Sequence, residues 1–170
     1  MSATSSLLAP DWIAMVVGGV STIASACDAA LRPSLMRAVG STINADGSLV
    51  TVFLARRQSR QLLQNLATTG RIAVVFSQPS SHRTLQVKAD RVHTRPMTEA
   101  DRPLLDRYLV AMEKELKTVG VEPHFTRAML AYTVDDVVAV QFAPAEAFDQ
   151  TPGSRAGARI GAAQPTGSAP

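Results

Sequence analysis

Cysteine is almost absent from this chain of 170 residues, which holds only Cys27. A single cysteine excludes an internal disulfide, and a chain without disulfides is typical of a reducing compartment. We therefore expect a cytoplasmic protein. Cys27 stands among apolar neighbours, and no acid–base partner can be placed beside it. That setting is typical of core packing rather than of a reactive thiol.

Long hydrophobic runs are also lacking. The longest, residues 12–20, falls far short of the roughly 20 apolar residues that span a bilayer. Residues 1–10 carry no basic segment of the kind that begins a secretory signal. We therefore expect a soluble chain with no membrane partner.

Charge is sparse, at 18% of residues, and the formal net charge is only +3. With 46% hydrophobic residues, this is the balance of an ordinary globular domain, and 170 residues can bury a core large enough for independent folding. The mild positive excess suits an anionic small ligand. Because there is no long run of Lys and Arg, we do not expect a nucleic-acid partner.

Several catalytic and metal-binding motifs are missing as well. The three histidines, His82, His93 and His124, are scattered and have no metal-ligand spacing with a cysteine or a carboxylate, so we expect no metal. There is no phosphate-binding Walker loop, no dinucleotide-binding glycine pattern and no nucleophile elbow. These absences leave any catalytic residue unknown. His82, beside Arg83, fits either the mouth of a site or an ordinary surface loop.

What the chain does hold is a dense run of short sheet elements in residues 33–90. Asp46-Gly47 predicts a primed hairpin turn between two of them. Residues 71–77 are apolar almost throughout, as in a strand buried on both faces. We expect a mainly β fold with peripheral helices (α+β). Its centre would be a six-stranded antiparallel β-barrel built from residues 19–27, 34–44, 49–54, 71–77, 84–95 and 137–143.

Helices are expected around this barrel, over residues 12–15, 58–69, 98–119 and 123–132. Thr98 with Asp101 makes an imperfect capping box at the start of the longest one. Leu105, Leu109, Met112, Leu116 and Val119 follow at spacings of three or four, and this apolar stripe predicts packing in the core or in a dimer.

The composition changes at residue 150, where the sequence turns to Thr, Pro, Gly, Ser and Ala. Such a composition is typical of a segment without fixed structure. The sequence therefore predicts a barrel domain of residues 1–149 and a flexible C-terminal tail of residues 150–170.

Residues 56–60, with the sequence Arg-Arg-Gln-Ser-Arg, lie where a strand passes into a helix. Backbone N–H groups at a helix start are unpaired, and the helix dipole there favours negative charge. A hydroxyl and guanidinium groups at this point make a phosphate site. We favour Ser59 and Arg60, with Arg56 or Arg57 as a third partner. A solvated charge cluster around the helix start is the alternative.

Two further candidates lie on strands. Alternation places Thr84, Gln86 and Lys88 on one strand face, where they could serve the carbonyl-rich edge of a heterocycle, with Lys88 stabilising negative charge. An exposed polar sheet face would show the same pattern. Arg37 stands among apolar positions and needs a partner, which either a bound phosphate or a structural ion pair would supply.

The order of these elements over residues 19–92 resembles the FMN-binding split-barrel superfamily, typified by pyridoxamine 5′-phosphate oxidase, and especially its small bacterial members. The matching segments are the strand with Arg37, the Asp-Gly hairpin, the basic helix start and the strands that follow. The resemblance implies a split barrel and a homodimer with FMN at the subunit interface. It also implies that Arg37, Ser59 and Arg60 approach the phosphate, and that Thr84, Gln86 and Lys88 reach the flavin.

The resemblance further implies a flavin-dependent oxidoreductase with a small-molecule substrate. The oxidase's C-terminal substrate motif, which carries arginine and histidine, has no counterpart after Val137, so we do not expect pyridoxamine phosphate to be that substrate. Two alternatives stay open. One is a non-enzymatic module that carries a flavin, a deazaflavin or haem, with His82 or the tail as the place for an axial haem ligand. The other is a barrel that has lost its cofactor.

Overall fold

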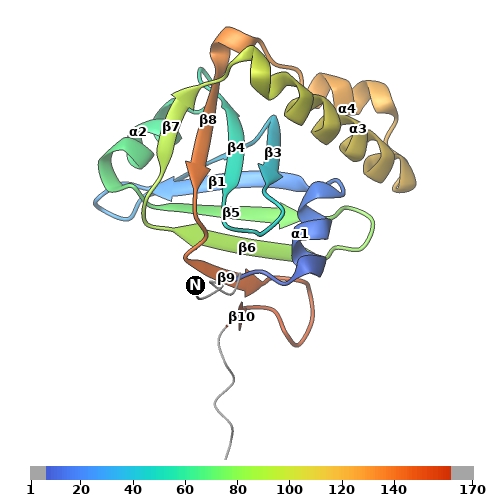
Figure 1. The fold of residues 1–170 in the computed structure, drawn as a ribbon, viewed down its shortest axis with the longest axis horizontal. Coiled ribbons are helices and arrows are strands. Elements are labelled where there is room, and N and C mark those ends of the chain that lie inside the picture. The colour runs from blue at the N-terminus through green and yellow to red at the C-terminus, as the bar shows by residue number, and fades with distance from the viewer. Residues whose placement is uncertain (1–6, 162–170) are drawn as a thin grey trace, which may run out of the picture.

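The computed structural model describes residues 7–161, which form two β-sheets with helices around them (Figure 1). The helices are α1 (Pro10–Val17), α2 (Arg60–Thr69), α3 (Arg102–Thr118) and α4 (Pro123–Met129). Two 3-10 turns, η1 (Glu99–Asp101) and η2 (Val134–Asp136), precede α3 and β8. The strands are β1 (Ser21–Cys27), β2 (Pro33–Arg37), β3 (Gly40–Ile43), β4 (Val50–Ala55), β5 (Ile72–Ser77), β6 (Thr84–Ala89), β7 (His93–Pro96), β8 (Val137–Phe142), β9 (Glu146–Asp149) and β10 (Ala158–Ile160).

The strands form a six-stranded sheet, in the order β10-β9-β6-β5-β1-β2, and a four-stranded sheet, in the order β3-β4-β8-β7. The paired neighbours run antiparallel. The prediction of a mainly β fold with peripheral helices is thus confirmed. The detail of a six-stranded barrel is not, because residues 7–161 form more strands than six and the two sheets do not close into one barrel.

Two of the expected strands turn a corner and take part in both sheets. Residues 34–44 divide into β2 and β3 at Ala38 and Val39. The Ala38 N–H donates to the Thr22 carbonyl in the six-stranded sheet, and the Val39 N–H donates to the Phe53 carbonyl in the four-stranded sheet, both at 2.9 Å. Residues 84–95 divide likewise into β6 and β7. In residues 34–44 apolar side chains stand on both faces and mark no break at the corner, which is why the sequence predicted a single strand there.

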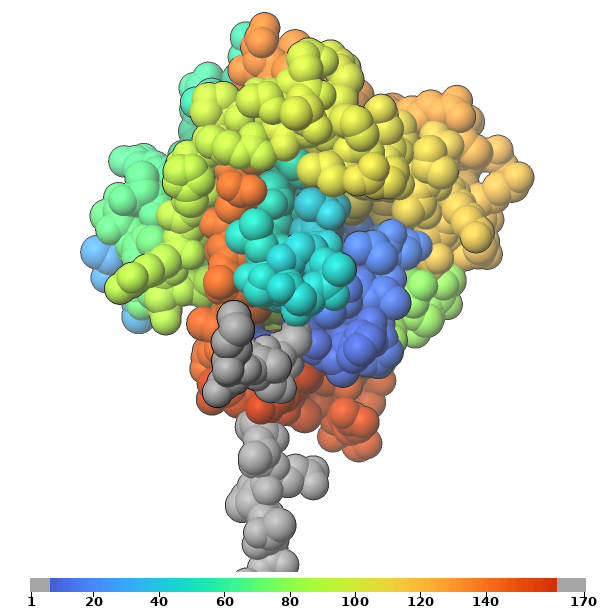
Figure 2. Space-filling view, in the orientation of Figure 1, coloured from blue at the N-terminus to red at the C-terminus, as the bar shows by residue number. Residues whose placement is uncertain are grey.

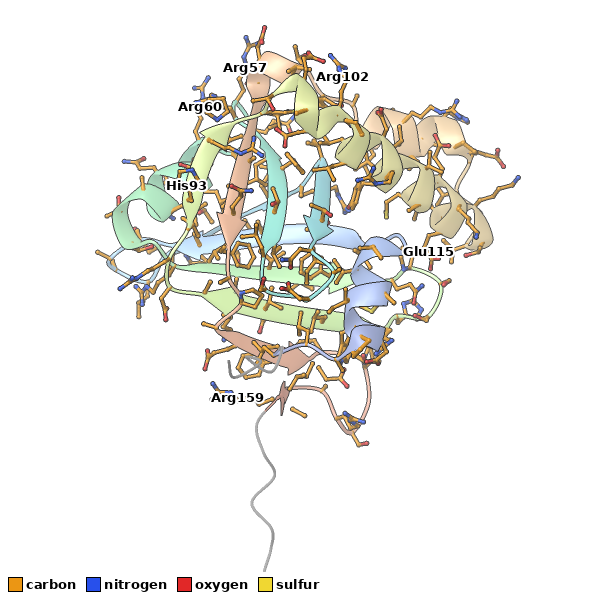
Figure 3. All side chains as sticks on the ribbon, in the orientation of Figure 1. Arg57, Arg60, His93, Arg102, Glu115 and Arg159 are labelled. Atoms are coloured by element: carbon orange, nitrogen blue, oxygen red, sulfur yellow. The ribbon has the colours of Figure 1, made fainter. Side chains whose placement is uncertain are left out.

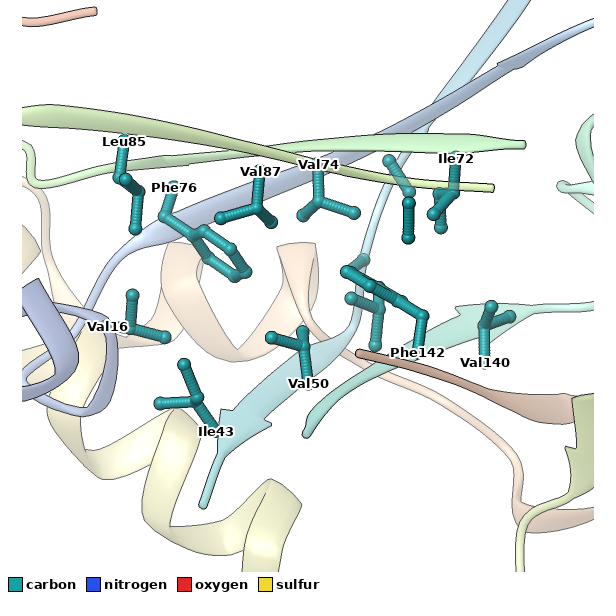
Figure 4. Packing of buried hydrophobic residues seen from close by; sticks show 14 of the residues in the cluster. Val16, Ile43, Val50, Ile72, Val74, Phe76, Leu85, Val87, Val140 and Phe142 are labelled. Atoms are coloured by element: carbon teal, nitrogen blue, oxygen red, sulfur yellow. The ribbon is translucent and has the colours of Figure 1, made fainter. Parts of the chain in front are cut away.

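The main core lies between the two sheets (Figure 4). Side chains of both sheets meet there with side chains of α1 and α2, among them Val74, Phe76, Leu85, Val50, Phe142, Val16 and Leu62. Burying each large apolar side chain contributes about 1.5–3 kcal/mol. The prediction that residues 71–77 are buried on both faces is wrong. In β5, buried residues alternate with half-buried ones, because only one face of this sheet meets the core.

The Asp46-Gly47 hairpin joins β3 to β4, but its turn is not the primed two-residue turn that the sequence predicted. The loop runs from Asn44 to Leu49, and the Asn44 N–H donates to the Leu49 carbonyl at 3.0 Å. In this loop only Gly47 has a positive φ, at +72°. Asp46 instead accepts the Ser48 N–H on Oδ1 at 3.0 Å, a local turn that Asp favours.

Helices α3 and α4 cover one end of the molecule, where Figure 2 shows their atoms in yellow and orange. The predicted capping box of Thr98 and Asp101 is present at η1, which continues into α3. The buried residues of α3 are Leu105, Tyr108 and Met112. Val119, the last residue of the predicted stripe, does not join the core of the single chain and is 48% exposed. The second half of α3 packs against α4 rather than against a sheet, so it has less apolar surface to cover.

The chain after β8 adds two strands that the sequence did not predict. β9 pairs with β6, and β10 pairs with β9 at the edge of the six-stranded sheet. The part of the predicted tail up to Gly161 therefore lies against the sheet, whereas residues 162–170 fall outside the described residues. The division of the chain at residue 150 stays a prediction. Among the helices described, none is long and apolar enough to cross a membrane.

Candidate functional site

Strand β6 carries three of the predicted cofactor residues on its outer side. Leu85 and Val87 are fully buried in the core between the sheets. Thr84, Gln86 and Lys88 alternate with them, are half-buried and point away from that core. The structure thus places these three polar side chains on one face, as the alternation of the sequence indicates.

Arg37 lies on the same face of the six-stranded sheet. Residues directly opposite each other in antiparallel strands point to the same side. Across five strands the register aligns Arg37, Ile23, Val75, Gln86 and Phe148. We call this outer surface, with Arg37, Thr84, Gln86 and Lys88, the polar face.

A row of hydroxyl groups extends the polar face beside Arg37. Ser21 on β1 is opposite Ser77 on β5, which is opposite Thr84 on β6. The exposed Arg37 donates from Nη1 to Ser21 Oγ at 2.6 Å, and Ser77 Oγ lies 2.9 Å from Thr84 Oγ1. The partner of Arg37 is therefore a hydroxyl rather than a carboxylate. An arginine beside a row of hydroxyls forms a donor set suited to an anion.

Lys88 stands beside an aromatic ring that the sequence analysis did not single out. Its Nζ lies 4.8 Å from the centre of the Phe148 ring on β9. Next to it is a cavity of about 330 Å³ whose wall includes Cys27, Arg71 and Glu146. The half-buried Cys27, expected in the core, instead lines this cavity. At this end of the polar face, an ammonium group is available to a negatively polarised ligand.

The other four predicted residues lie at the start of α2, apart from the polar face. Arg56, Arg57 and Arg60 are exposed, and Figure 3 shows Arg57 and Arg60 at one corner of the molecule. The Arg57 N–H donates to Asp136 Oδ1 at 3.2 Å, and the Arg57 Nε lies 3.7 Å from the same oxygen. Arg57 therefore already has an anionic partner. In the described residues, no hydrogen bond or ion pair joins this group to the polar face.

Ser59 is the N-cap residue of α2 and is only 1% exposed. Its Oγ makes no hydrogen bond to the first turn of the helix, and it is one of two buried side-chain polar atoms without a partner in residues 7–161. A buried hydroxyl without a partner is costly, by about 1–3 kcal/mol. The Ser59 hydroxyl is thus enclosed, whereas Arg60 beside it is exposed, and the phosphate role of both residues stays a prediction.

The remaining predictions concern metals and histidines. Residues 7–161 contain no group of three or more His, Cys, Asp or Glu side chains that could hold a metal ion. His82 has a positive φ of +58° in the loop between β5 and β6. Its backbone is held there by the Gln78 carbonyl, which accepts the His82 N–H at 2.9 Å.

Sequence reasoning missed Ser21, Ser77 and Phe148 on the polar face. Each belongs to a strand whose alternation is readable in the sequence. What brings them beside Arg37, Gln86 and Lys88 is the register between strands that are distant along the chain. Only a prediction of strand order would have found them.

Similarity to known proteins is found at the level of structure and not of sequence. No protein-family model matches the sequence. A search of curated proteins also finds no match.

Solved structures do match. A candidate pyridoxamine 5′-phosphate oxidase from Lactobacillus delbrueckii superposes with a TM-score of 0.53 at 13% identity, over 87% of this chain and 99% of its own. HupZ of Group A Streptococcus gives 0.53 at 12% identity, over 88% and 99%. An F420 reductase gives 0.51 at 15% identity, over 79% and 94%. At these identities the likeness concerns the fold, and it extends over most of the described residues. The chain has the fold of these structures, in line with the split-barrel fold that the sequence resemblance implies.

Proposed function

We propose that this protein binds FMN and acts as a flavin-dependent oxidoreductase, with the cofactor between two copies of the chain. The observation that carries the proposal is the polar face. Arg37, Gln86 and Lys88 share one open surface of a sheet whose other side is a closed apolar core. A phosphorylated, aromatic cofactor needs cations for its phosphate and hydrogen-bonding groups for its ring.

The phosphate group has two places to bind in this proposal. Arg37 with the hydroxyl row of Ser21, Ser77 and Thr84 offers one donor set. Ser59 and Arg60 at the start of α2 offer the other, and the sequence resemblance implies both of them together with Arg37. Charge-assisted hydrogen bonds of this kind contribute about 1.5–3 kcal/mol each.

In this proposal, side chains of strand β6 contact the flavin ring. FMN would supply electron or hydride transfer when bound, and the chain's own residues would bind and orient it. The Gln86 amide can both donate and accept at a carbonyl-rich edge. Lys88 presents a positive charge to the same edge, where it favours any build-up of negative charge. We propose a small-molecule substrate other than pyridoxamine phosphate, because the oxidase's substrate motif has no counterpart after Val137.

A homodimer would cover the polar face. Helix α2 packs against the six-stranded sheet through core residues such as Leu62 and Leu66, so it leaves the outer surface open. Leu35, on β2 beside Arg37, is 63% exposed. An open sheet face with an exposed leucine is a surface that a second copy can bury. The single cysteine suits a cytoplasmic location for such an enzyme.

The first experiment is the visible spectrum of the purified protein. Flavin maxima, with FMN released on denaturation, would support the proposal. A Soret band would favour haem, and tight binding of F420 in preference to FMN would favour the deazaflavin. A colourless protein that does not quench the fluorescence of added FMN would overturn the cofactor claim.

A comparison of the affinities for FMN and for riboflavin, which lacks the phosphate, then separates the contribution of the phosphate to binding from that of the ring. If the phosphate lies beside Arg37, Arg37→Ala is expected to weaken FMN about tenfold or more and riboflavin hardly at all, and if it lies at the start of α2, Arg60→Ala is expected to show that loss instead. Arg102→Ala, a surface arginine paired with Glu99, is the matched control. Equal losses for FMN and riboflavin would contradict a phosphate role.

Light scattering of the wild type and of Leu35→Glu tests the dimer, which the added charge should dissociate.

A further inference from the structure

A second cavity, of about 470 Å³, lies where α1 meets the loop between β5 and β6 and the segment after β9. In Figure 2 the blue atoms of α1 lie beside the red atoms of the C-terminal segment. The residues that carry charge or aromatic surface in its wall are Asp11, Trp12, Arg83, Asp149 and Arg155. The volume is within the range of small-molecule sites, about 300–1,000 Å³. None of these residues belongs to the polar face.

Arg83 is held in a fixed position in this wall. Its guanidinium carbon lies 4.0 Å from the centre of the Trp12 ring, and its Nη2 forms an ion pair with Asp11 Oδ2. Its Nη1 also approaches the Asp11 carbonyl, at 3.5 Å. A guanidinium has five N–H donors, so Arg83 keeps donors for another partner. Because its rotamer is already fixed, binding through Arg83 loses little side-chain entropy.

Asp149 is the buried charge of the cavity. Its side chain is 9% exposed, and it points to the opposite face of β9 from Phe148. Oδ1 accepts the Thr151 N–H at 3.0 Å. Oδ2 lies 3.7 Å from Arg155 Nε, too far for a hydrogen bond, and the Arg155 side chain is 79% exposed. A buried carboxylate is costly unless it is paired, so Oδ2 is an acceptor with an incomplete set of partners.

The backbone of the segment after β9 is fixed to β6, which keeps the wall in place. The Thr84 N–H donates to Thr151 Oγ1 at 3.1 Å, and the Gln150 N–H donates to the Thr84 carbonyl at 2.8 Å. The Gly157 N–H closes the loop on the Asp149 carbonyl at 2.7 Å. The cavity is therefore built from elements that already hold one another.

The charges in this wall balance, since Asp11 and Asp149 face Arg83 and Arg155. A ligand with a single charge would be attracted by the residues of opposite charge and repelled by those of like charge. A small ligand that carries one positive and one negative group can contact a carboxylate and a guanidinium at once. We propose that the cavity binds a free α-amino acid, whose ammonium group pairs with Asp149 and whose carboxylate pairs with Arg83. Trp12 and Pro152 supply the apolar part of the wall. This site is independent of the proposed flavin.

The test uses the fluorescence of Trp12, the single tryptophan of the chain. The unmodified protein is titrated with glycine, L-leucine and L-phenylalanine, and calorimetry repeats each titration. At least one is expected to bind, and its N-acetylated and amidated forms, which each lack one charge, are expected to bind about tenfold more weakly or worse. Failure of all three to bind at about 10 mM, or equal binding of the capped forms, would overturn the proposal.

Two variants assign the charges. Asp149→Asn should weaken the free amino acid about tenfold and leave the N-acetylated form unchanged, because that form has no ammonium group. Arg83→Gln should weaken the free amino acid and leave the amidated form unchanged. Asp136→Asn, whose carboxylate lies outside this cavity, is the control. A loss that does not depend on which charge the ligand lacks would contradict the assignment. If a variant fails to fold, as thermal melting would show, the ligand series on the unmodified protein still decides.

Discussion

Arg95 and Asp101 form a two-pronged ion pair, with Nη1–Oδ2 and Nη2–Oδ1 distances of 2.7 Å each. Asp101 is 4% exposed and also accepts the Thr98 N–H on Oδ2 at 2.9 Å. Arg95 lies on β7, and Asp101 ends the 3-10 turn that leads into α3. The pair therefore fixes the start of the longest helix to the four-stranded sheet.

This ion pair predicts a specific loss of stability in acid. The hydrogen bond from Arg95, with those from Thr98, outweighs burial and lowers the pKa of Asp101 from 3.8 to about 2. Because the folded pKa is below the unfolded one, the ionised form stabilises the native state above about pH 4. That contribution, on the order of 2 kcal/mol, is lost as the pH falls toward 2.

Urea unfolding at several pH values between 7 and 2 measures the effect. Asp101→Asn should be less stable than the wild type at pH 7 and should show a flatter pH dependence between 4 and 2. Asp90→Asn, at an exposed carboxylate, serves as the control. An unchanged acid profile in Asp101→Asn would rule out this account.

The Tyr108 hydroxyl predicts a second effect on stability. It donates to the Val20 carbonyl at 2.7 Å and lies 3.4 Å from Thr22 Oγ1, and both contacts are buried where α3 meets the start of β1. Tyr108→Phe leaves the Val20 carbonyl without this partner, so the free energy of unfolding should fall by about 1–2 kcal/mol. Tyr132→Phe, at the less buried tyrosine, should change it by much less. Equal losses of unfolding free energy in the two variants would mean that the buried hydrogen bond of Tyr108 does not stabilise the fold.

Alanine substitutions at Gly70 and Gly120 distinguish the destabilisation caused by backbone strain from that caused by steric contact. Both have positive φ values, +68° and +84°. A Cβ at Gly70 would lie 2.9 Å from the Asp90 carbonyl oxygen, whereas a Cβ at Gly120 would meet nothing within 4 Å. Gly120→Ala should cost about 1 kcal/mol from strain alone, and Gly70→Ala should cost more. Thermal melting of the two variants compares them directly. A larger loss for Gly120→Ala would contradict the contact at Asp90.

Shortening the chain tests the strands after β8. A chain that ends at Asp149 lacks β10 and the Arg159–Glu146 ion pair of 2.9 Å, and it leaves β9 as an unpaired edge. An exposed edge strand pairs readily with another chain. We expect a lower melting temperature and association that rises with concentration, measured against a chain that ends at Gly161. Identical melting and light scattering would show that β10 adds nothing.

The elements with local signals could be predicted from the sequence. The end of α2 at Thr69 and the capping box of Thr98 and Asp101 depend on residues a few positions apart, and both were predicted from the sequence. The corner at Ala38 and Val39 was not, because apolar residues stand on both faces of residues 34–44 and mark no break there. It depends on which distant strand each N–H meets.

The features of the candidate site likewise divide into those that the sequence could predict and those that it could not. The outward direction of Thr84, Gln86 and Lys88 follows from alternation and could be predicted. The contact of Arg57 with Asp136 could not, since 79 positions separate the two residues and both had plausible local roles. The alignment of Ser21, Ser77 and Thr84 depends on strand order, which the pattern of a single sequence does not contain.

The corner strands also determine how the molecule must unfold. Residues 34–44 cannot leave one sheet without pulling hydrogen bonds from the other, and residues 84–95 are tied to both sheets in the same way. Neither sheet can melt while its neighbour stays intact. The two sheets should therefore form one cooperative folding unit, and a fragment that carries only one of them should not hold native structure alone.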